Sequence, residues 1–377
     1  MSIKLGDLVA RLDSAYPPGT AESWDAVGLV CGDPRDAVRR VLLAVDPVEE
    51  VVEEAEHRGA DTIVTHHPLL LRGVHSVSAD TPKGRVVHRL IRSGIALYVA
   101  HTNADSAQGG VNDALADLIG LTDTHPLAPA TDDELTLVTY APEDAVQPVL
   151  DAISAAGAGV IGDYRRCAWT TPGTGTFEAG EAANPTIGAA GERSTIAEVK
   201  IEAVLPAAAR ASVVRALVQA HPYEEPPVQL LRQATRPART GIGRVGTLTT
   251  PLTLGELASR LAAAVPATAH GVRVSGPSHA TVSRVAVCSG AGDSLFDRVR
   301  ASGADVYVTA DLRHHPAGEA RAHNADGRPY LIDLSHWASE WPWLPRCAAL
   351  LEQEWPQLPT HVSTVCTDPW TFVVPSP

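Results

Sequence analysis

Three apolar runs, RRVLLAVD (39–46), DTIVTHH (61–67) and IALYVAHTN (95–103), decide the fold class of this chain. Each run is typical of a buried strand, and helical patterns separate them at 47–59 and 84–94. Strands separated by helices of this length form right-handed βαβ units around a parallel sheet. This part of the sequence therefore predicts an α/β fold.

The same alternation returns toward the C-terminus. Strand and helix patterns alternate there, beginning with a strand, over 283–290, 293–303, 304–311, 318–327, 328–335 and 343–355. One βαβ-type unit therefore lies toward each end of the chain. Together the two units predict a split α/β core made of two halves.

The middle of the chain has a different pattern. Strands are predicted over 134–142 and 196–206, and helices over 146–157 and 208–222. This order is typical of a small α+β domain of ferredoxin-like type, inserted between the two halves of the core. Residues 167–194 are rich in Gly, Thr and Pro, which favours irregular loops.

The domain boundaries follow from these patterns. Residues 232–246 are predicted to be a linker back to the core, and the tail over 356–377 has no strong periodicity. We therefore expect the first half of the core at 1–131, the insert at 132–236 and the second half of the core at 237–377.

The composition is that of a globular protein without a membrane span. The 377 residues are 45% hydrophobic and 20% charged, and no run approaches the roughly 20 consecutive apolar residues that cross a bilayer. The N-terminus carries acids and lacks an apolar h-region, so no signal peptide is expected. A net charge of −14 disfavours nucleic-acid and membrane partners. The five cysteines form no CxxC pair, which favours a reducing cytoplasm over a disulfide framework or a cysteine zinc site.

Histidines beside carboxylates are the chemically informative feature. Of the 15 histidines, four fall with two acids at the C-terminal ends of predicted strands. The three groups are Thr65-His66-His67-Pro68, His101-Thr-Asn-Ala-Asp105 and His336-Trp-Ala-Ser-Glu340. Open α/β sheets bind their ligands at this edge. The three groups are therefore candidates for one shared site.

Local geometry allows the side chains within each group to converge. Neighbouring strand residues point to opposite faces, so His66 and His67 converge only where the strand ends, which Pro68 favours. Residues four apart share one face of a helix, which applies to the other two groups. Taken singly, each group also fits an ordinary role: surface histidines at a turn, a helix-entry loop, or a polar helix start.

Four histidines and two carboxylates together suit two divalent cations with coordination positions left open for water. No thiolate joins the set, so zinc, iron, manganese, cobalt and nickel are all candidates.

Three other motifs carry weaker signals. DLRHH (311–315) follows a strand, so His314 and His315 either line the same cleft or lie in a solvated loop. GTGTF (173–177) lacks the Lys-Ser/Thr pair of a phosphate-binding loop. HPYEEP (221–226) is interpreted as a helix terminus and turn, with metal binding the less favoured alternative. No GxSxG motif is present, so a Ser-His-Asp nucleophile is not predicted.

Five motifs in a fixed order suggest a family. They are WDAVGL (24–29), THHPLLL (65–71), AHTNAD (100–105), GGVN (109–112) and SHWASE (335–340). In this order the motifs resemble the GTP cyclohydrolase 1 type 2 homologs, also called Ngg-interacting-factor-three-like proteins. The ordered set is specific, and the resemblance runs from about residue 5 to residue 353.

The middle of the chain is similar to the long members of that family. The motifs that carry this similarity are GAGVIGDYRRCAW (157–169), GTGTF (173–177), NPTIG (184–188) and AHPYEEP (220–226). The resemblance implies that the insert has the fold of the trimeric PII signalling proteins.

The resemblance also implies a dinuclear metal site between the two α/β halves, and toroidal homohexamers whose sites face an internal cavity. The residues that match the family's metal ligands are His66, His67, Asp105, His336 and Glu340. His101 matches a further site histidine, either an additional ligand or a proton relay. Ser335 stands where many members have glycine, a departure that still permits the turn.

The family name implies opening of the GTP ring, but two metal ions that activate water serve hydrolysis in general. We therefore expect a metal-dependent hydrolase acting on a nucleotide-like small molecule. One alternative is a non-catalytic metal-binding or regulatory ring whose insert senses a ligand. Another is a structural scaffold with incidental histidines, which predicts no stoichiometric metal.

Overall fold

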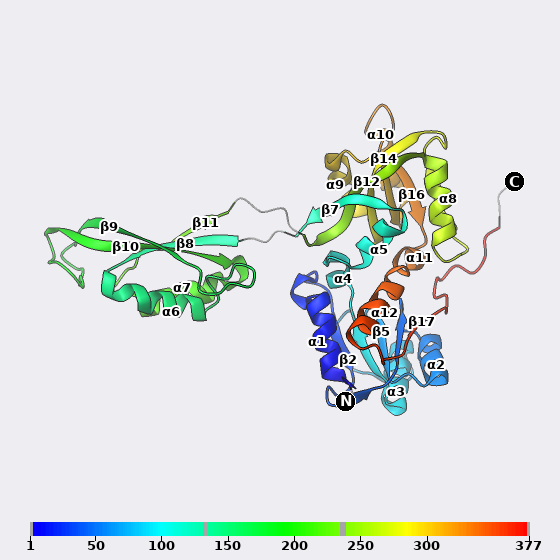
Figure 1. The fold of residues 1–377 in the computed structure, drawn as a ribbon, viewed down its shortest axis with the longest axis horizontal. Coiled ribbons are helices and arrows are strands. Elements are labelled where there is room, and N and C mark those ends of the chain that lie inside the picture. Colours follow the sequence, from blue (N-terminus) through cyan, green and yellow to red (C-terminus); the bar gives the residue numbers. More distant parts are fainter. Residues whose placement is uncertain (1–2, 131–133, 234–238, 375–377) are drawn as a thin grey trace. The chain divides into compact units, whose positions relative to one another are not determined.

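The computed structural model describes residues 3–130, 134–233 and 239–374 (Figure 1). The chain divides into two compact units, which we describe separately. The core unit comprises residues 1–130 and 239–377, and the inserted unit comprises residues 131–238.

The first half of the core unit is built on a five-stranded sheet with the order β17-β4-β5-β6-β2. Its strands are β2 (Gly28–Cys31), β4 (Val41–Ala44), β5 (Thr62–Thr65), β6 (Ala96–Val99) and β17 (Thr360–Val362). Neighbours from β17 to β6 are parallel, and β2 pairs antiparallel with β6. The same half also contains a two-stranded antiparallel sheet of β1 (Ile3–Lys4) and β3 (Ala37–Val38).

Helices cover both faces of this sheet, which explains why its central strands β4, β5 and β6 are buried at every residue. Val41 and Leu43 belong to one apolar cluster with α1 (Leu5–Ala15) and α12 (Trp343–Glu354). Leu42 belongs to a second cluster with α2 (Glu49–Arg58) and α3 (Pro82–Ser93). This is a three-layer α/β/α arrangement. Gly59 and Gly94 end α2 and α3 in the left-handed conformation, with φ of 65° and 62°.

The second half of the core unit contains a six-stranded sheet with the order β13-β16-β15-β14-β12-β7. Its strands are β7 (Leu121–Pro129), β12 (Gly241–Thr253), β13 (Arg273–Ser275), β14 (Thr281–Ala291), β15 (Val306–Ala310) and β16 (Tyr330–Leu334). Among neighbouring strands of this sheet, β14 with β15 and β15 with β16 pair parallel, and the other pairs are antiparallel. The helices packed on its two faces are α5 (Val111–Leu118) and α8 (Leu254–Ala264) on one, and α9 (Phe296–Ser302) and α10 (His314–Ala322) on the other.

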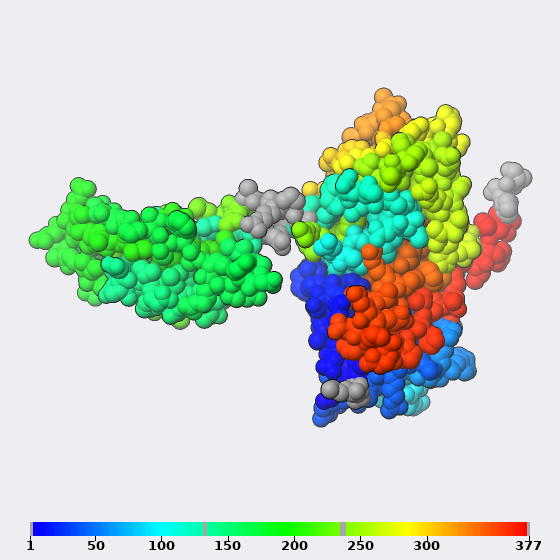
Figure 2. Space-filling view, in the orientation of Figure 1, coloured from blue at the N-terminus to red at the C-terminus, as the bar shows by residue number. Residues whose placement is uncertain are grey.

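Two short helices, α4 (Thr102–Ser106) and α11 (His336–Glu340), follow strands β6 and β16. Single turns of 3₁₀ helix lie at Pro18–Thr20, Glu143–Ala145, Ala207–Ala209 and Asp293–Leu295. The two halves of the core unit exchange segments, because β7 precedes the insert yet joins the second sheet, whereas β17 comes from the C-terminal region and joins the first. Figure 2 shows the orange residues of α11 and α12 between the blue first half and the cyan-to-yellow second half.

The inserted unit has the element order β8 (Glu134–Ala141), α6 (Val146–Ala155), β9 (Trp169–Glu178), β10 (Arg193–Pro206), α7 (Arg210–Ala220) and β11 (Gln229–Arg232). Its antiparallel sheet has the strand order β11-β8-β10-β9. This β-α-β-β-α-β succession is the ferredoxin-like one. Val149 of α6 and Val213 of α7 pack with Ile201 of the sheet in the core of this unit.

The predicted α/β class is confirmed, and three local predictions are wrong. The stretch 167–194, expected to be irregular, contains β9, which pairs with β10 along its length. β9 is an edge strand with mostly exposed residues, so it lacks the apolar alternation that marks a strand. Residues 241–246 of the expected linker belong to β12. The tail, for which no element was predicted, contains the short strand β17. The core sheets are mixed, because β2, β7, β12 and β13 pair antiparallel with their neighbours.

The linker prediction also covers residues 234–238, which lie outside the described residues. Within the described residues, no helix has the length and apolar character needed to cross a membrane.

Candidate metal centre

The predicted site residues gather where strands of the two core sheets end. His66 and His67 directly follow β5, and His101 directly precedes α4, which contains Asp105. The remaining two residues, His336 and Glu340, begin and end α11, which follows β16. Each functional side chain is thus placed by the end of a parallel strand or by the first turn of a short helix.

Two overlapping clusters of donor atoms result. In His66, His67 and His101, one ring nitrogen from each lies within 4.8 Å of the others. His67, His336 and Glu340 form a second group by the same measure, so His67 is common to both. Either group could hold a metal ion.

Glu340 lies between the histidines. Its Oε1 atom is 3.0 Å from His336 Nε2 and 3.4 Å from His66 Nε2, and its Oε2 atom is 3.0 Å from His67 Nε2. Asp105 lies farther out, with Oδ1 3.8 Å from His66 Nε2. The carboxylate of Glu340 therefore lies within reach of three imidazoles.

The four histidines share one hydrogen-bonding pattern, because each ring has its Nδ1 atom held by a backbone or carboxylate oxygen. His66 Nδ1 is 2.9 Å from the Ala100 carbonyl. The other three pairs are His67 with Asp46 at 2.7 Å, His101 with Asp25 at 2.8 Å and His336 with Asp311 at 2.7 Å. Since a neutral imidazole donates from one nitrogen and accepts at the other, Nδ1–H leaves the Nε2 lone pair free to bind a metal.

Three polar atoms at the centre are buried without a hydrogen bond in the described part of the chain. They are His66 Nε2, Asp105 Oδ1 and Glu340 Oε2. Buried polar atoms are almost always satisfied, and an ion that has not been included is a recognised reason for an exception. The donor set of imidazole nitrogen and carboxylate oxygen therefore fits a divalent transition metal.

Gly290 keeps space beside Glu340. A Cβ atom at this position would lie 2.6 Å from Glu340 Oε1 and 3.2 Å from His336 Nε2, and its φ of +66° favours glycine as well. Ser335, which precedes His336, has a φ of −64°, so glycine is not required there. Its hydroxyl caps α11 by accepting a hydrogen bond from the Ala338 backbone N–H.

A model of the Duf34/NIF3 (NGG1p interacting factor 3) family matches residues 3–369. The chain belongs to this family. A Mycobacterium tuberculosis protein named GTP cyclohydrolase 1 type 2 homolog is 50% identical over 375 residues, covering 99% of this chain and 98% of that protein. A Bacillus subtilis protein of the same name is 36% identical, with 90% of each chain covered.

Solved structures of this NIF3 family show the same fold. A Staphylococcus aureus protein is 31% identical, with a TM-score of 0.78 and 99% of each chain covered. A Bacillus cereus protein described as related to NIF3 is 33% identical, with a TM-score of 0.68, and covers 99% of this chain and 100% of its own.

In this NIF3-family chain, Glu340 and the surrounding imidazoles shift one another's pKa values and so set the charge of the site. Burial favours the neutral form of His67, but Glu340 and Asp46 outweigh it and raise the pKa of His67 to about 10. Attraction to Glu340 raises the pKa of His336 to about 11, against burial. Burial acts to raise the pKa of Glu340, but the three imidazoles hold it well below its usual range. Burial raises the pKa of Asp105.

The metal-free protein should therefore lose stability as the pH rises. The unfolded pKa of histidine is about 6.5, and the folded values of about 10 for His67 and 11 for His336 are higher. The stabilisation from these two groups is then fully present below pH 6.5 and is lost as the pH rises through their folded pKa values. Urea unfolding of chelator-treated protein at pH 6.5, 8 and 10 measures this fall. Metal-loaded protein should lack it, since metal binding requires neutral imidazoles. Equal falls with and without metal would contradict the expectation.

Sequence reasoning gave no orienting role to Asp25, Asp46 and Asp311, which hold the Nδ1 atoms of three of the histidines. A signal was present for two of them. Asp46 closely follows β4 and Asp311 directly follows β15, so both lie at the same sheet edges as the histidines. Asp25 lies in the WDAVG motif, away from any strand end, and no spacing marked it.

The histidines of the weaker motifs lie outside the candidate metal centre. His314 and His315 are exposed in the first turn of α10, and only Asp311 of that motif contacts a site residue. His221 ends α7 with both ring nitrogens occupied, by the Tyr140 carbonyl and the Tyr223 N–H. The GTGTF motif lies inside β9 and forms no loop.

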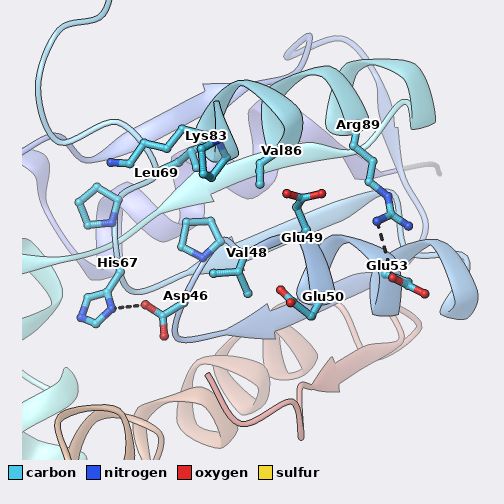
Figure 3. Close-up of a pocket in the computed structure, with 13 residues that line it drawn as sticks. Asp46, Val48, Glu49, Glu50, Glu53, His67, Leu69, Lys83, Val86 and Arg89 are labelled. Atoms are coloured by element: carbon cyan, nitrogen blue, oxygen red, sulfur yellow. Dashed lines mark hydrogen bonds and ion pairs between the residues drawn. The ribbon is translucent and has the colours of Figure 1, made fainter. Parts of the chain in front are cut away.

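A cleft of about 640 Å³ begins at His67 and Asp46 and continues between α2 and α3. Figure 3 shows His67 and Asp46 at one end, Lys83 on the opposite wall beside Leu69, and Glu53 with Arg89 at the other end. Its walls include the apolar side chains of Val48, Leu69 and Val86. The candidate ligand His67 thus faces a space large enough for a small molecule.

Proposed function

We propose that this chain is a metal-dependent hydrolase that holds two divalent cations and acts on a nucleotide-like substrate. The proposed ligands are His66, His67, Asp105, His336 and Glu340. The observation that carries the proposal is the convergence of free Nε2 atoms on a buried carboxylate, with every Nδ1 atom held from behind. The ions would lower the pKa of coordinated water and polarise the bond under attack.

The chain's own residues divide the remaining work. Asp46 and Asp311 fix the rings of His67 and His336, so each Nε2 atom keeps its direction. The side chain of His101 is partly exposed to solvent, whereas that of His66 is buried. Asp25 holds the Nδ1 atom of His101. We assign it a role as an additional ligand or as a group that carries a proton to or from the substrate.

We assign substrate binding to the cleft beside His67. Lys83 supplies a cation in the same cleft as His67, suited to an anionic group such as phosphate, and Leu69 and Val86 supply apolar surface. In the described part of the chain Lys83 has no ion-pair partner, so its charge is available to a ligand.

The assembly and location are further parts of the proposal. We propose a toroidal homohexamer, a PII-like role for the inserted unit and a cytoplasmic location. These rest on family membership and composition, and light scattering of the purified chain measures the number of subunits.

An activity screen tests the proposal. Protein loaded separately with zinc, manganese, cobalt, nickel or ferrous iron is assayed with GTP and a panel of phosphate esters. We expect the wild type to turn over at least one substrate and His336→Ala to lower the rate roughly 100-fold or more. Removing a group that orients a metal ligand costs about 10- to 100-fold in activity, and removing the ligand itself should cost more. His75→Ala, at an exposed histidine, is the matched control and should retain activity. Metal-loaded protein that is inert on every substrate would refute catalysis and favour the non-catalytic ring.

A further inference from the structure

The tail of the chain contacts residues that neighbour or hold the candidate metal ligands. We define the C-terminal strap as residues 363–368, which follow β17. Ser363 donates its backbone N–H to the Leu43 carbonyl at 2.8 Å, which continues the pairing of β17 with β4. The Ser363 carbonyl accepts a hydrogen bond at 3.1 Å from the indole of Trp341, the residue after Glu340. The strap therefore touches the first sheet and the end of α11 at the same residue.

The next contact of the strap is with Asp46. The Thr367 hydroxyl donates to Asp46 Oδ2, while Asp46 Oδ1 accepts from His67 Nδ1 at 2.7 Å. Both oxygens of this carboxylate are therefore occupied, one by the strap and one by the candidate ligand. A carboxylate held at both oxygens cannot rotate, so the hydroxyl of Thr367 fixes the direction of the His67 ring.

The last contact is with the residue before His336. Asp368 is buried and accepts a hydrogen bond from the Ser335 hydroxyl. With its proton directed to Asp368, the Ser335 oxygen presents a lone pair to the Ala338 N–H, 3.3 Å away. This arrangement caps α11, the helix that carries His336 and Glu340.

From these contacts we infer that Thr367 and Asp368 are positioning residues of the metal centre. Neither touches the proposed ions, and each acts through a group that orients a proposed ligand. Through these two residues the strap fixes the position of His67, which follows a strand of the first sheet, relative to α11, which belongs to the second half of the core unit. The inference rests on the proposed metal ligands and adds that the strap sets their affinity for metal.

Metal affinity of the full-length chain tests the inference. Zinc binding is measured by competition with a chromophoric chelator for the wild type, Thr367→Val, Thr367→Ser and Asp368→Ala. Removing a group that orients a ligand lowers metal affinity by about 10- to 100-fold, which we expect for Thr367→Val and Asp368→Ala. Thr367→Ser keeps the hydroxyl and should bind zinc as the wild type does. Thr364→Val, at an exposed threonine of the same strap, is the matched control.

A spectroscopic readout separates positioning from simple destabilisation. Visible absorption of the cobalt-loaded chain reports ligand geometry, and it should change in Thr367→Val but not in Thr364→Val. Zinc affinity of Thr367→Val within twofold of the wild type, or an equal loss in Thr364→Val, would overturn the inference and leave the proposed function intact. A wild-type chain that binds no zinc or cobalt would overturn both.

Discussion

Glu340→Gln is expected to abolish tight metal binding. This carboxylate lies within 3.4 Å of the Nε2 atoms of His66, His67 and His336, so it contacts members of both candidate clusters. The amide keeps the volume but loses the charge that attracts cations. We expect an affinity loss of roughly 100-fold or more, beyond the effect of removing an orienting group. Metal content after dialysis against a weak chelator measures the loss.

The same change should also alter the titration of the metal-free protein. Glu340 is the largest cause that raises the pKa of His336 and of His67. Without it, the fall in stability above pH 6.5 should flatten, because the folded pKa values move back toward the unfolded one. Glu354→Gln, at a half-exposed residue of α12 paired with Arg11, is the matched control. Full metal content in Glu340→Gln would show that the ions bind elsewhere.

Arg244→Met is expected to destabilise the core unit by about 3–5 kcal/mol, the cost of leaving a buried charge without its partner. The Arg244 side chain is 2% exposed, and its Nε atom is 2.6 Å from Asp113 Oδ1. Its other nitrogens donate to the carbonyls of Ala107, Gly241 and Gly243. The side chain thereby joins the segment before α5 to β12, two parts of the core unit that the insert separates in sequence.

The measurement for Arg244 is urea unfolding followed by circular dichroism. Arg35→Met is the matched control, because Arg35 also pairs with an aspartate, Asp33, but is 86% exposed. An exposed pair adds little to stability, so the control should unfold at the wild-type urea concentration. If both variants unfold alike, the buried pair does not hold the core unit together.

The sequence predicted the parts of the molecule in which local pattern and tertiary role agree. Strands β4, β5 and β6 are apolar because helices cover both faces, so continuous apolar runs marked them. The histidines were found because strand ends are detectable, and the ends of parallel strands meet at one edge.

The remaining elements could not be predicted, because long-range pairing creates them. β9 is exposed, β17 has three residues, and β12 contains four glycine or proline positions that resemble a linker. Thr367 lies in a tail without periodicity, and only its hydrogen bond to Asp46, 321 residues away, gives it a role at the centre. Contacts of this separation leave no local pattern in the sequence.

The most direct test of the metal centre is a count of its metal ions. Elemental analysis of the purified wild-type chain, repeated after reloading with zinc and dialysis, gives moles of divalent metal per mole of chain. We predict two for the wild type, and a loss in His67→Ala that exceeds the loss in His336→Ala, because His67 belongs to both donor groups. A wild-type chain that retains no stoichiometric metal would contradict the assignment of a metal centre.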